Sequence, residues 1–397
     1  FHLTNLQAEA ILEMKLQTLS GLEREKIAKE IKEKEKEIAY YQELLKDPRK
    51  ISQVIKEELE NIKKNFADER RTKVVLGEIK EFKEEDLIPA EDNLIFLSQD
   101  LYIKRFSPEI LRAQKRGGKG LIGFETKNKD RVNLILKANT HDNLLIFTNK
   151  GRIFQMKAYE IPEASRMSRG KSLFNFLELP SNEKIASLLN FSSQNPPSFL
   201  VILTKNGIIK KLSSKELQNV RRVGLLVIKL KEGDEFLGAK FLEKNEEILI
   251  ATGQGQLLRF SEKDLREMKR SAAGVLGIKL KKGDEVRGFD VVKSSLKSAQ
   301  LFVITEKGFG KFSPLSAYRV QHRSGYGIKT AKITSKTGKL AGIQVIPKET
   351  KEIIVSSQRG LLIKINSQDV PLQSRVSQGV RLIKLDPDDQ VAGTVWL

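Results

Sequence analysis

The stretch LLIFTNKGRIFQM, residues 144–156, places two apolar runs on either side of a turn that contains Gly151. It predicts two short antiparallel strands, because glycine adopts the positive φ angles that a tight hairpin turn needs. Related stretches recur at LIFLSQDLYIKRF (94–106), FLVILTKNGIIKKL (199–212), ILIATGQGQLLRF (248–260), QLFVITEKGFGKF (300–312) and EIIVSSQRGLLIKI (352–365). The sequence therefore predicts six copies of one β unit.

The spacing of the turns indicates how the units are built. The turn position is occupied by Leu101 in the first copy and then by Gly151, Gly207, Gly255, Gly308 and Gly360, at intervals of 48 to 56 residues. Four strands of ordinary length with their turns fit such an interval, which is typical of propeller-like arrays rather than helical solenoids. We expect a mainly β, six-bladed, propeller-like domain over residues 91–397.

A second recurring element is a loop in which an arginine precedes a glycine by four residues. Examples are RMSRG (166–170), RSAAG (270–274), RSGYG (323–327) and RVSQG (375–379). In the first unit this place is taken by a more basic heptad, which consists of Gln114, Lys115, Arg116, Gly117, Gly118, Lys119 and Gly120. A basic, glycine-rich loop is suited to holding phosphate groups, since glycine lets backbone N–H groups approach an anion. A solvated turn is the structural alternative.

Further cations recur with the repeat and are candidates for the same surface. In the equivalent loops they are Arg166, Arg169, Arg221, Arg222, Lys269, Arg270, Arg323 and Arg375, and in the second hairpin strands they are Lys104, Arg105, Lys210, Lys211, Arg259, Lys311 and Lys364. A radial array places equivalent loops around one rim, so these residues predict a basic belt. About half of the strand cations can be explained as solvated side chains instead.

The charge distribution favours a polyanionic partner for the repeat region. Of a formal net charge of +20, none comes from residues 1–72, which hold 15 basic and 15 acidic residues. Nucleic acid is favoured over a membrane, because the sequence has no apolar run of 18 residues and no signal-like N-terminus. With no cysteine and three scattered histidines, His2, His141 and His322, we expect neither disulfides nor a metal site.

Residues 1–72 predict helices, and residues 73–90 a linker. Apolar residues at spacings of three and four residues, interrupted only by Lys34, form a coiled-coil seam at Ile27, Ile31, Ile38, Tyr41 and Leu45. Pro48 should end this helix, and a second amphipathic helix should follow. Residues 1–22 are too short to cover the seam, so we expect its partner before Phe1 or on another chain. A chain that begins without methionine is expected to be a fragment of a longer protein.

Together these motifs resemble the A subunits of bacterial DNA gyrase. LTNLQAEAILEMKLQTLSGLEREKI (3–27) is similar to their dimerising C-gate and returning coiled-coil arm, and ADERRTKV (67–74) to the end of their cleavage domain. The heptad resembles the gyrase A box, with Lys115 in place of the family's first arginine. Lysine keeps the charge but loses the planar fork that binds a phosphate bidentately.

The resemblance implies a six-bladed β-pinwheel that binds, bends and wraps duplex DNA without sequence specificity. Its box would fasten the end of the wrap and link the first and last blades, and wrapping would give the enzyme ATP-dependent negative supercoiling. The catalytic tyrosine would lie upstream of Phe1, so this fragment would be non-catalytic and would hold no cofactor.

The same resemblance implies a holoenzyme of two A and two B subunits, in which the B subunit binds ATP and Mg²⁺, located in the cytoplasm on the bacterial chromosome. Two alternatives remain at this stage. One is the related subunit of topoisomerase IV, in which the box is degraded or missing. The other is a propeller-like scaffold that binds proteins, for which the charge of +20 is unexpectedly high.

Overall fold

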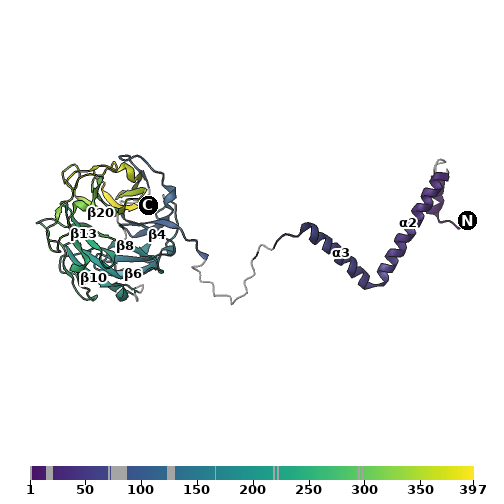
Figure 1. Ribbon diagram of the computed structural model, residues 1–397, viewed down its shortest axis with the longest axis horizontal. Coiled ribbons are helices and arrows are strands. Elements are labelled where there is room, and N and C mark those ends of the chain that lie inside the picture. Colours follow the sequence, from purple (N-terminus) through teal and green to yellow (C-terminus); the bar gives the residue numbers. More distant parts are fainter. Residues whose placement is uncertain are drawn as a thin grey trace. The chain divides into compact units, whose positions relative to one another are not determined.

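A computed structural model describes residues 2–14, 21–69, 72, 87–122, 130–165, 167–217, 220, 223–293, 296 and 298–397. The chain divides into two compact bodies, a helical body over Phe1–Lys80 and a β body over Glu81–Leu397 (Figure 1). Most of the linker expected at 73–90 lies outside the described residues, since only 87–90 of it are described.

The helical body contains α1 (Asn5–Leu12), α2 (Gly21–Lys46) and α3 (Pro48–Phe66). The predicted break at Pro48 is confirmed: Asp47 caps α3 by accepting a hydrogen bond from the Arg49 N–H at 2.9 Å, and proline occupies the first helical position. The predicted apolar seam of α2 is exposed, from 38% at Ile27 to 74% at Leu45. The described part of the helical body therefore leaves this seam without the cover that a coiled coil requires.

The β body consists of six four-stranded antiparallel sheets, which confirms the six predicted units. We call these sheets blades one to six. From the innermost strand outward, blade one contains β4 (Val132–Asn139), β1 (Asp92–Ser98), β2 (Tyr102–Phe106) and β7 (Lys171–Ser172), and blade two contains β8 (Ile185–Phe191), β5 (Asn143–Thr148), β6 (Arg152–Lys157) and β11 (Leu225–Leu226). In the same order, blade three contains β12 (Phe236–Leu242), β9 (Phe199–Thr204), β10 (Ile208–Ser213) and β15 (Val275–Leu276), and blade four contains β16 (Val286–Val292), β13 (Glu247–Thr252), β14 (Gln256–Ser261) and β19 (Ile328–Lys329). Blade five contains β20 (Leu340–Pro347), β17 (Ala299–Thr305), β18 (Phe309–Pro314) and β23 (Val380–Arg381), and blade six contains β24 (Val391–Trp396), β21 (Glu352–Ser357), β22 (Leu361–Asn366) and β3 (Leu121–Ile122).

Short 3₁₀ turns follow the strands at the outer part of the blades. They are η3 (Pro108–Ile110), η4 (Ala158–Glu160), η5 (Leu173–Asn175), η6 (Ser214–Leu217), η7 (Glu262–Asp264), η8 (Leu315–Ala317) and η9 (Ser367–Asp369).

Every blade takes its outermost strand from a different unit. Three strands of a blade come from one repeat, and the fourth, only two residues long, comes from the next repeat in the chain. For blade six the next repeat is the first one, because β3 pairs with β22. The innermost strands β4, β8, β12, β16, β20 and β24 contact one another in turn around the ring and line a cavity of about 740 Å³. The ring is thus closed by strand exchange.

Six hydrophobic cores fill the spaces between neighbouring blades. In β1, Ile95 and Leu97 pack toward blade two, whereas Leu94 and Phe96 pack toward blade six. The first strand of each hairpin is therefore buried on both faces, which explains its unbroken apolar run. Second strands such as β2 and β6 contain partly exposed residues among the buried ones.

The hairpin turn is held by the same side-chain hydrogen bond in all six units. A buried serine or threonine ends the first strand and accepts a hydrogen bond from the backbone N–H four residues later, with the acceptors Ser98, Thr148, Thr204, Thr252, Thr305 and Ser357 at 3.1 to 3.4 Å. In each unit a register shift in the pairing with the innermost strand lies directly beside the acceptor. On the other side, the hydroxyl group gives the backbone N–H at the start of the second hairpin strand an acceptor.

Thr305 offers a test of this turn bond, because its hydroxyl group accepts a hydrogen bond from the Phe309 N–H and donates one to the Phe309 C=O. We expect Thr305→Val to lower the free energy of unfolding by about 1–3 kcal/mol, since the buried Phe309 N–H loses its acceptor. Thr305→Ser is the matched control and should cost less, because serine fills the same position in the first and sixth units. Urea unfolding measures both, and equal losses would show that the lost methyl packing, not the hydrogen bond, stabilises the turn.

Candidate nucleic-acid interface

The basic heptad Gln114–Gly120 lies on blade six, although it belongs to the first unit. One backbone hydrogen bond joins it to β22 of that blade, Gln114 N–H to Lys364 O (2.7 Å). Two more join it to the segment of the sixth unit that follows β23: Gly117 N–H to Leu382 O (2.7 Å) and Lys384 N–H to Gly118 O (2.9 Å). Directly after it, Leu121 and Ile122 pair with Leu362 and Leu361 of β22. The heptad and β3 together form what we call the clasp, residues 114–122, which joins the first unit to the last blade.

The three charged residues of the clasp point into solvent. Lys115, Arg116 and Lys119 are exposed, and within the described part of the chain no hydrogen bond or ion pair engages their charged groups. Exposed and unpaired cations have not exchanged their hydration for a protein partner, so they are available to bind an anion.

The clasp needs glycine where its backbone approaches β22. Gly120 has φ +76°, and a Cβ there would lie 2.6 Å from the Leu362 carbonyl oxygen. Gly117 has a similar φ of +77°, but a Cβ there would meet nothing closer than the Arg381 oxygen at 3.7 Å. Gly117 is therefore required by its backbone angle alone, whereas Gly120 is also required because a Cβ has no space there.

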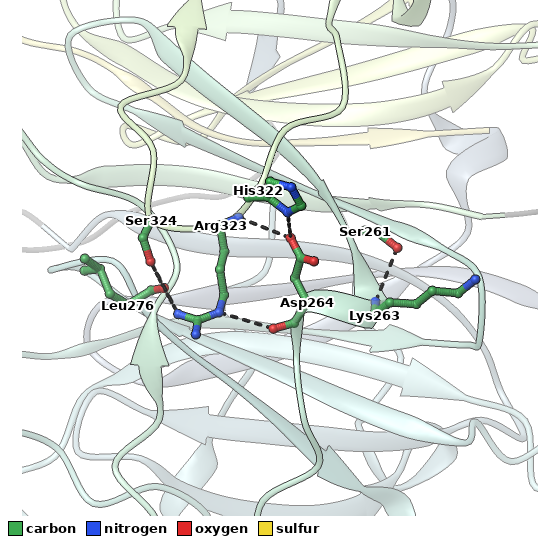
Figure 2. A network of polar contacts seen from close by, with 7 residues as sticks. All are labelled: Ser261, Lys263, Asp264, Leu276, His322, Arg323 and Ser324. Carbon is green, nitrogen blue, oxygen red and sulfur yellow. Dashed lines mark hydrogen bonds and ion pairs between the residues drawn. The ribbon is translucent and has the colours of Figure 1, made fainter.

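The other arginine-glycine loops occupy the equivalent place on their own preceding blades, but those of their arginines that the structure describes are bound to protein. Figure 2 shows the loop of the fifth unit, in which the Arg323 guanidinium donates to Asp264 O at 3.2 Å and to Leu276 O at 3.0 Å. The neighbouring His322 ring lies 3.4 Å from the Asp264 carboxylate. Arg323 thereby ties three segments of the chain together.

Three further loop arginines are engaged in comparable ways. Arg375 donates to Lys329 O at 3.0 Å, and Arg270 lies 3.1 Å from the Glu216 carboxylate. Arg169 stacks 3.6 Å above the Tyr102 ring and lies 3.8 Å from a carboxylate oxygen of Asp100. These arginines remain partly exposed, whereas Lys269 is exposed. The predicted residues Arg166, Arg221 and Arg222 lie outside the described residues.

Three of the predicted rim lysines are inside the protein. The sequence places Lys104, Lys210 and Lys311 on an exposed rim, but their side chains are at most 1% exposed. Each ammonium group donates to carbonyl oxygens of the loop that crosses from the next unit: Lys104 to Ser165 and Ser168 (3.3 and 2.7 Å), Lys210 to Arg270 and Ala272 (2.7 and 3.0 Å), and Lys311 to Ser374, Arg375 and Ser377 (2.6, 2.9 and 3.1 Å).

The physical reason for this burial is that a crossing loop brings carbonyl groups that no strand pairs. A buried charge is tolerated when it is fully hydrogen-bonded, and here three or more acceptors surround Lys210 and Lys311. Burial nevertheless lowers the pKa of Lys210 and of Lys311 to about 8.

The remaining strand cations are mostly buried and paired with carboxylates. Their side chains are 9 to 15% exposed, in the pairs Arg105–Glu163 (3.6 Å), Lys211–Glu262 (2.6 Å), Arg259–Glu247 (2.5 Å) and Lys364–Glu352 (2.8 Å). The described part of the predicted belt therefore divides into three groups. Strand cations are mostly buried and hold the ring together, loop arginines are partly exposed and bound to protein, and the clasp cations and Lys269 are exposed to solvent.

The buried lysines occur in every second blade. At the third residue after the turn position the six units carry Lys104, Phe154, Lys210, Leu258, Lys311 and Ile363. In the alternate blades the crossing loop lies on the apolar side chain instead, as a Cβ built at Gly224, Gly325 or Gly118 would lie 2.7, 3.3 or 3.5 Å from Phe154, Leu258 or Ile363. The clasp is one of the loops that rest on an apolar residue.

A row of exposed lysines was not predicted from the sequence. They are Lys229, Lys279, Lys332 and Lys384, each five residues after a loop glycine. Their recurrence in VIKL, GIKL, TAKI and LIKL was the available signal. In the described ranges there is no helix long and apolar enough to cross a membrane, and no group of three potential metal ligands.

The fold and this site define a strand-exchanged β-pinwheel whose ring is closed by a basic, glycine-rich clasp. The chain belongs to the family described as DNA gyrase C-terminal domain, beta-propeller, whose model matches residues 92–139, 142–192, 198–242, 246–293, 299–347 and 351–395. These six segments correspond to the six units.

Relatives of known name agree with this family. The chain is 41% identical over 396 residues to the DNA gyrase A subunit of Staphylococcus epidermidis (strain ATCC 12228 / FDA PCI 1200), and 39% identical to that of Staphylococcus aureus (strain NCTC 8325 / PS 47). In both cases the alignment covers 100% of this chain but 44% of the relative. The chain thus spans less than half the length of these relatives.

Solved structures give the same result. A DNA gyrase A C-terminal domain superposes with a TM-score of 0.70 at 26% identity, over 77% of this chain and 100% of that domain. The C-terminal domain of a DNA topoisomerase IV superposes with a TM-score of 0.58 at 23% identity, over 78% of this chain and 94% of that one. The second likeness supports the fold alone.

Replacing Lys311 with methionine tests the buried ammonium groups. We expect Lys311→Met to lower the free energy of unfolding at pH 7 by about 1–3 kcal/mol, because the crossing loop loses its donor. Between pH 8 and 10.5 the unfolded chain keeps a proton that folded Lys311 releases, so the stability of the parent chain should rise relative to the variant.

Urea unfolding at several pH values measures both effects, with Lys351→Met, which alters an exposed lysine, as the control. A stability difference that does not change between pH 8 and 10.5 would contradict the lowered pKa of Lys311.

The close approach of the clasp to β22 can be tested with two alanine substitutions that have the same free-energy cost from backbone strain. Gly117→Ala and Gly120→Ala both place a Cβ at a positive φ, which costs about 1–2 kcal/mol. Only Gly120→Ala also brings that Cβ within 2.6 Å of Leu362 O. We expect Gly120→Ala to be the less stable variant and to lose amide exchange protection over β3 and β22. Equal protection in the two variants would show that β3 pairing tolerates the added atom.

Proposed function

We propose that this chain binds duplex DNA around its outer edge, bends it and wraps it without reading its sequence. The observation that carries the proposal is the clasp: Lys115, Arg116 and Lys119 are exposed and unpaired in the described chain, whereas most other recurring cations are buried or bound to protein. Membership of the gyrase C-terminal family and the net charge of +20 support the same partner.

The physical task of such a surface is to offset the elastic cost of the bend. Smooth bending of 20 to 30 base pairs by 40 to 90° costs about 1–6 kcal/mol, and a longer wrap costs more. Lysine and arginine contacts to phosphates release counterions and supply this free energy whatever the base sequence. The contact at the end of the wrap matters most, because the free end of a bent duplex recoils first.

In the assembled enzyme we propose that wrapping presents a second segment of the same DNA to the cleavage domain with a fixed crossing hand. ATP-driven passage of that segment then introduces negative supercoils. The nucleophilic tyrosine of the relatives would lie in the part of the chain before Phe1, and a B subunit would supply ATP and Mg²⁺ binding. The chain by itself would bind DNA but cleave none, and would work as part of an A₂B₂ enzyme on the chromosome in the cytoplasm.

The exposed helical seam fits this assembly. Ile27, Ile31 and Ile38 of α2 are exposed in the described chain, and a coiled-coil arm needs a second helix along such a stripe. We propose that the second helix belongs to the preceding part of the same gyrase polypeptide.

Neutralising the clasp is the decisive experiment. Lys115, Arg116 and Lys119 are changed together to alanine in the full-length protein, which is then combined with a B subunit. We expect ATP-dependent supercoiling to disappear while relaxation and decatenation persist, because cleavage and strand passage use groups outside this chain. Binding of short duplexes should weaken only modestly, since other cations remain.

The matched control changes three exposed lysines in loops that join an innermost strand to the next unit, Lys244, Lys348 and Lys351, to alanine. It removes the same charge and should leave supercoiling intact. Normal supercoiling by a folded clasp variant would show that the heptad only makes a turn. Failure of the parent chain to bind DNA at all would favour a protein-binding scaffold.

A further inference from the structure

A row of exposed lysines leads along the ring to the clasp. Five residues after the loop glycine, the third to sixth units carry Lys229, Lys279, Lys332 and Lys384. All four are exposed. The four lysines occupy the same position of the repeat although they are far apart in the sequence, so the repeat sets their positions.

Each of these lysines is joined through its backbone to the loop of the following unit. The N–H groups donate to the carbonyl oxygen two residues before the next loop glycine: Lys229 to Ala272 (3.4 Å), Lys279 to Gly325 (2.9 Å), Lys332 to Ser377 (3.3 Å) and Lys384 to Gly118 (2.9 Å). The last of these carbonyl groups belongs to the clasp. Successive lysines are therefore connected by one loop each, and the series ends beside Lys115, Arg116 and Lys119.

The ammonium groups of the row are free to bind a ligand. In the described chain none forms an ion pair or a hydrogen bond, and their nearest aromatic contact is that of Lys279, 6.0 Å from the Tyr326 ring centroid. The loop arginines beside them are tied to carbonyl groups, as Arg323 and Arg375 show. In the described chain the charged groups of the row and of the clasp thus have no ion pair or hydrogen bond, whereas those of the buried strand cations and the described loop arginines do.

The row has a beginning as well as an end. The equivalent residue of the second unit is Asn175, and that of the first unit is Glu125 in the sequence, so neither is cationic. A general surplus of solvated lysines would have no reason to stop at one unit boundary and to continue without a gap through four others.

We infer that Lys229, Lys279, Lys332 and Lys384 form a phosphate-binding row that guides bound duplex DNA from the third unit to the clasp. This inference rests on the proposed DNA-wrapping function and adds the residues and the arc over which the wrap runs. Lysine suits the role, because a compact ammonium on a flexible stem can follow phosphates of any sequence. The wrap then leaves the first two units largely uncovered on its approach to the clasp.

The test compares three variants of the whole 397-residue chain. In the first, all four lysines of the row become glutamine. In the second, they become arginine, which keeps the charge. In the third, which is the control, glutamine replaces four exposed lysines in loops that join an innermost strand to the next unit: Lys244, Lys293, Lys348 and Lys351. None of the changes touches a backbone hydrogen bond, and thermal unfolding verifies that each variant is folded.

Binding to a long linear duplex is measured as a function of salt. Each neutralised phosphate contributes about −0.9 to the slope of log K against log salt, so the row glutamine variant should have a slope smaller in magnitude by about 3 to 4. The arginine variant should keep the parent slope, and the control should change it by less than about 1. Hydroxyl-radical footprinting should show a shorter protected length for the row glutamine variant only.

The outcomes separate this inference from the proposed function. A parent chain with a flat salt dependence would overturn the wrapping proposal itself. A steep parent slope, together with equal losses in the row and control variants, would leave wrapping intact and show that the row has no special part in it. A loss confined to the row glutamine variant would establish the row.

Discussion

The pairing of each unit's two-residue outer strand with the preceding blade is the interaction on which the rest of the structure depends. It forces a loop of every unit to cross to its neighbour, and it requires a glycine where the loop meets the strand beneath, as at Gly120. In five cases the exchange joins consecutive units, but in the sixth it joins the two ends of the ring through β3 and β22. The most basic loop lies at that joint, so the place that closes the ring is also the place best equipped to hold an anion.

The recurring cations divide according to the direction in which their blade position faces. Lys104, Lys210 and Lys311 are turned inward, where carbonyl groups of a crossing loop surround the ammonium. Removing such a charge affects stability. The clasp cations and the lysine row are turned outward, and in the described chain no protein group binds them, so under the proposed function their removal should weaken DNA binding and leave the fold unchanged. Burial therefore sorts one class of residue into two functions.

Much of the architecture could be predicted from the sequence because the same hairpin and loop motifs recur in successive units. Six hairpins, their turn glycines, the arginine-glycine frame and the helix break at Pro48 are all found in the structure. The direction in which a single cation points could not be predicted from its own strand, because blades are covered on both faces and even adjacent lysines such as Lys210 and Lys211 are buried. Only a comparison of all six units shows a sign of burial, because one position of the repeat alternates between lysine and an apolar residue. The lysine row was missed because it lies after the conspicuous loops, in segments whose charge resembles ordinary solvated surface.

Closure by β3 has a consequence for how the protein is made. Leu121 leaves the ribosome long before its partner Leu362, and at about 5–20 residues per second the delay is about 10 to 50 s. During that interval the first blade lacks one neighbour, and the segment around β3 has no strand to pair with. A nascent chain stopped anywhere before β22 cannot complete the ring, however well its earlier blades have formed. The synthesis of the sixth unit is therefore the step that allows the ring to close.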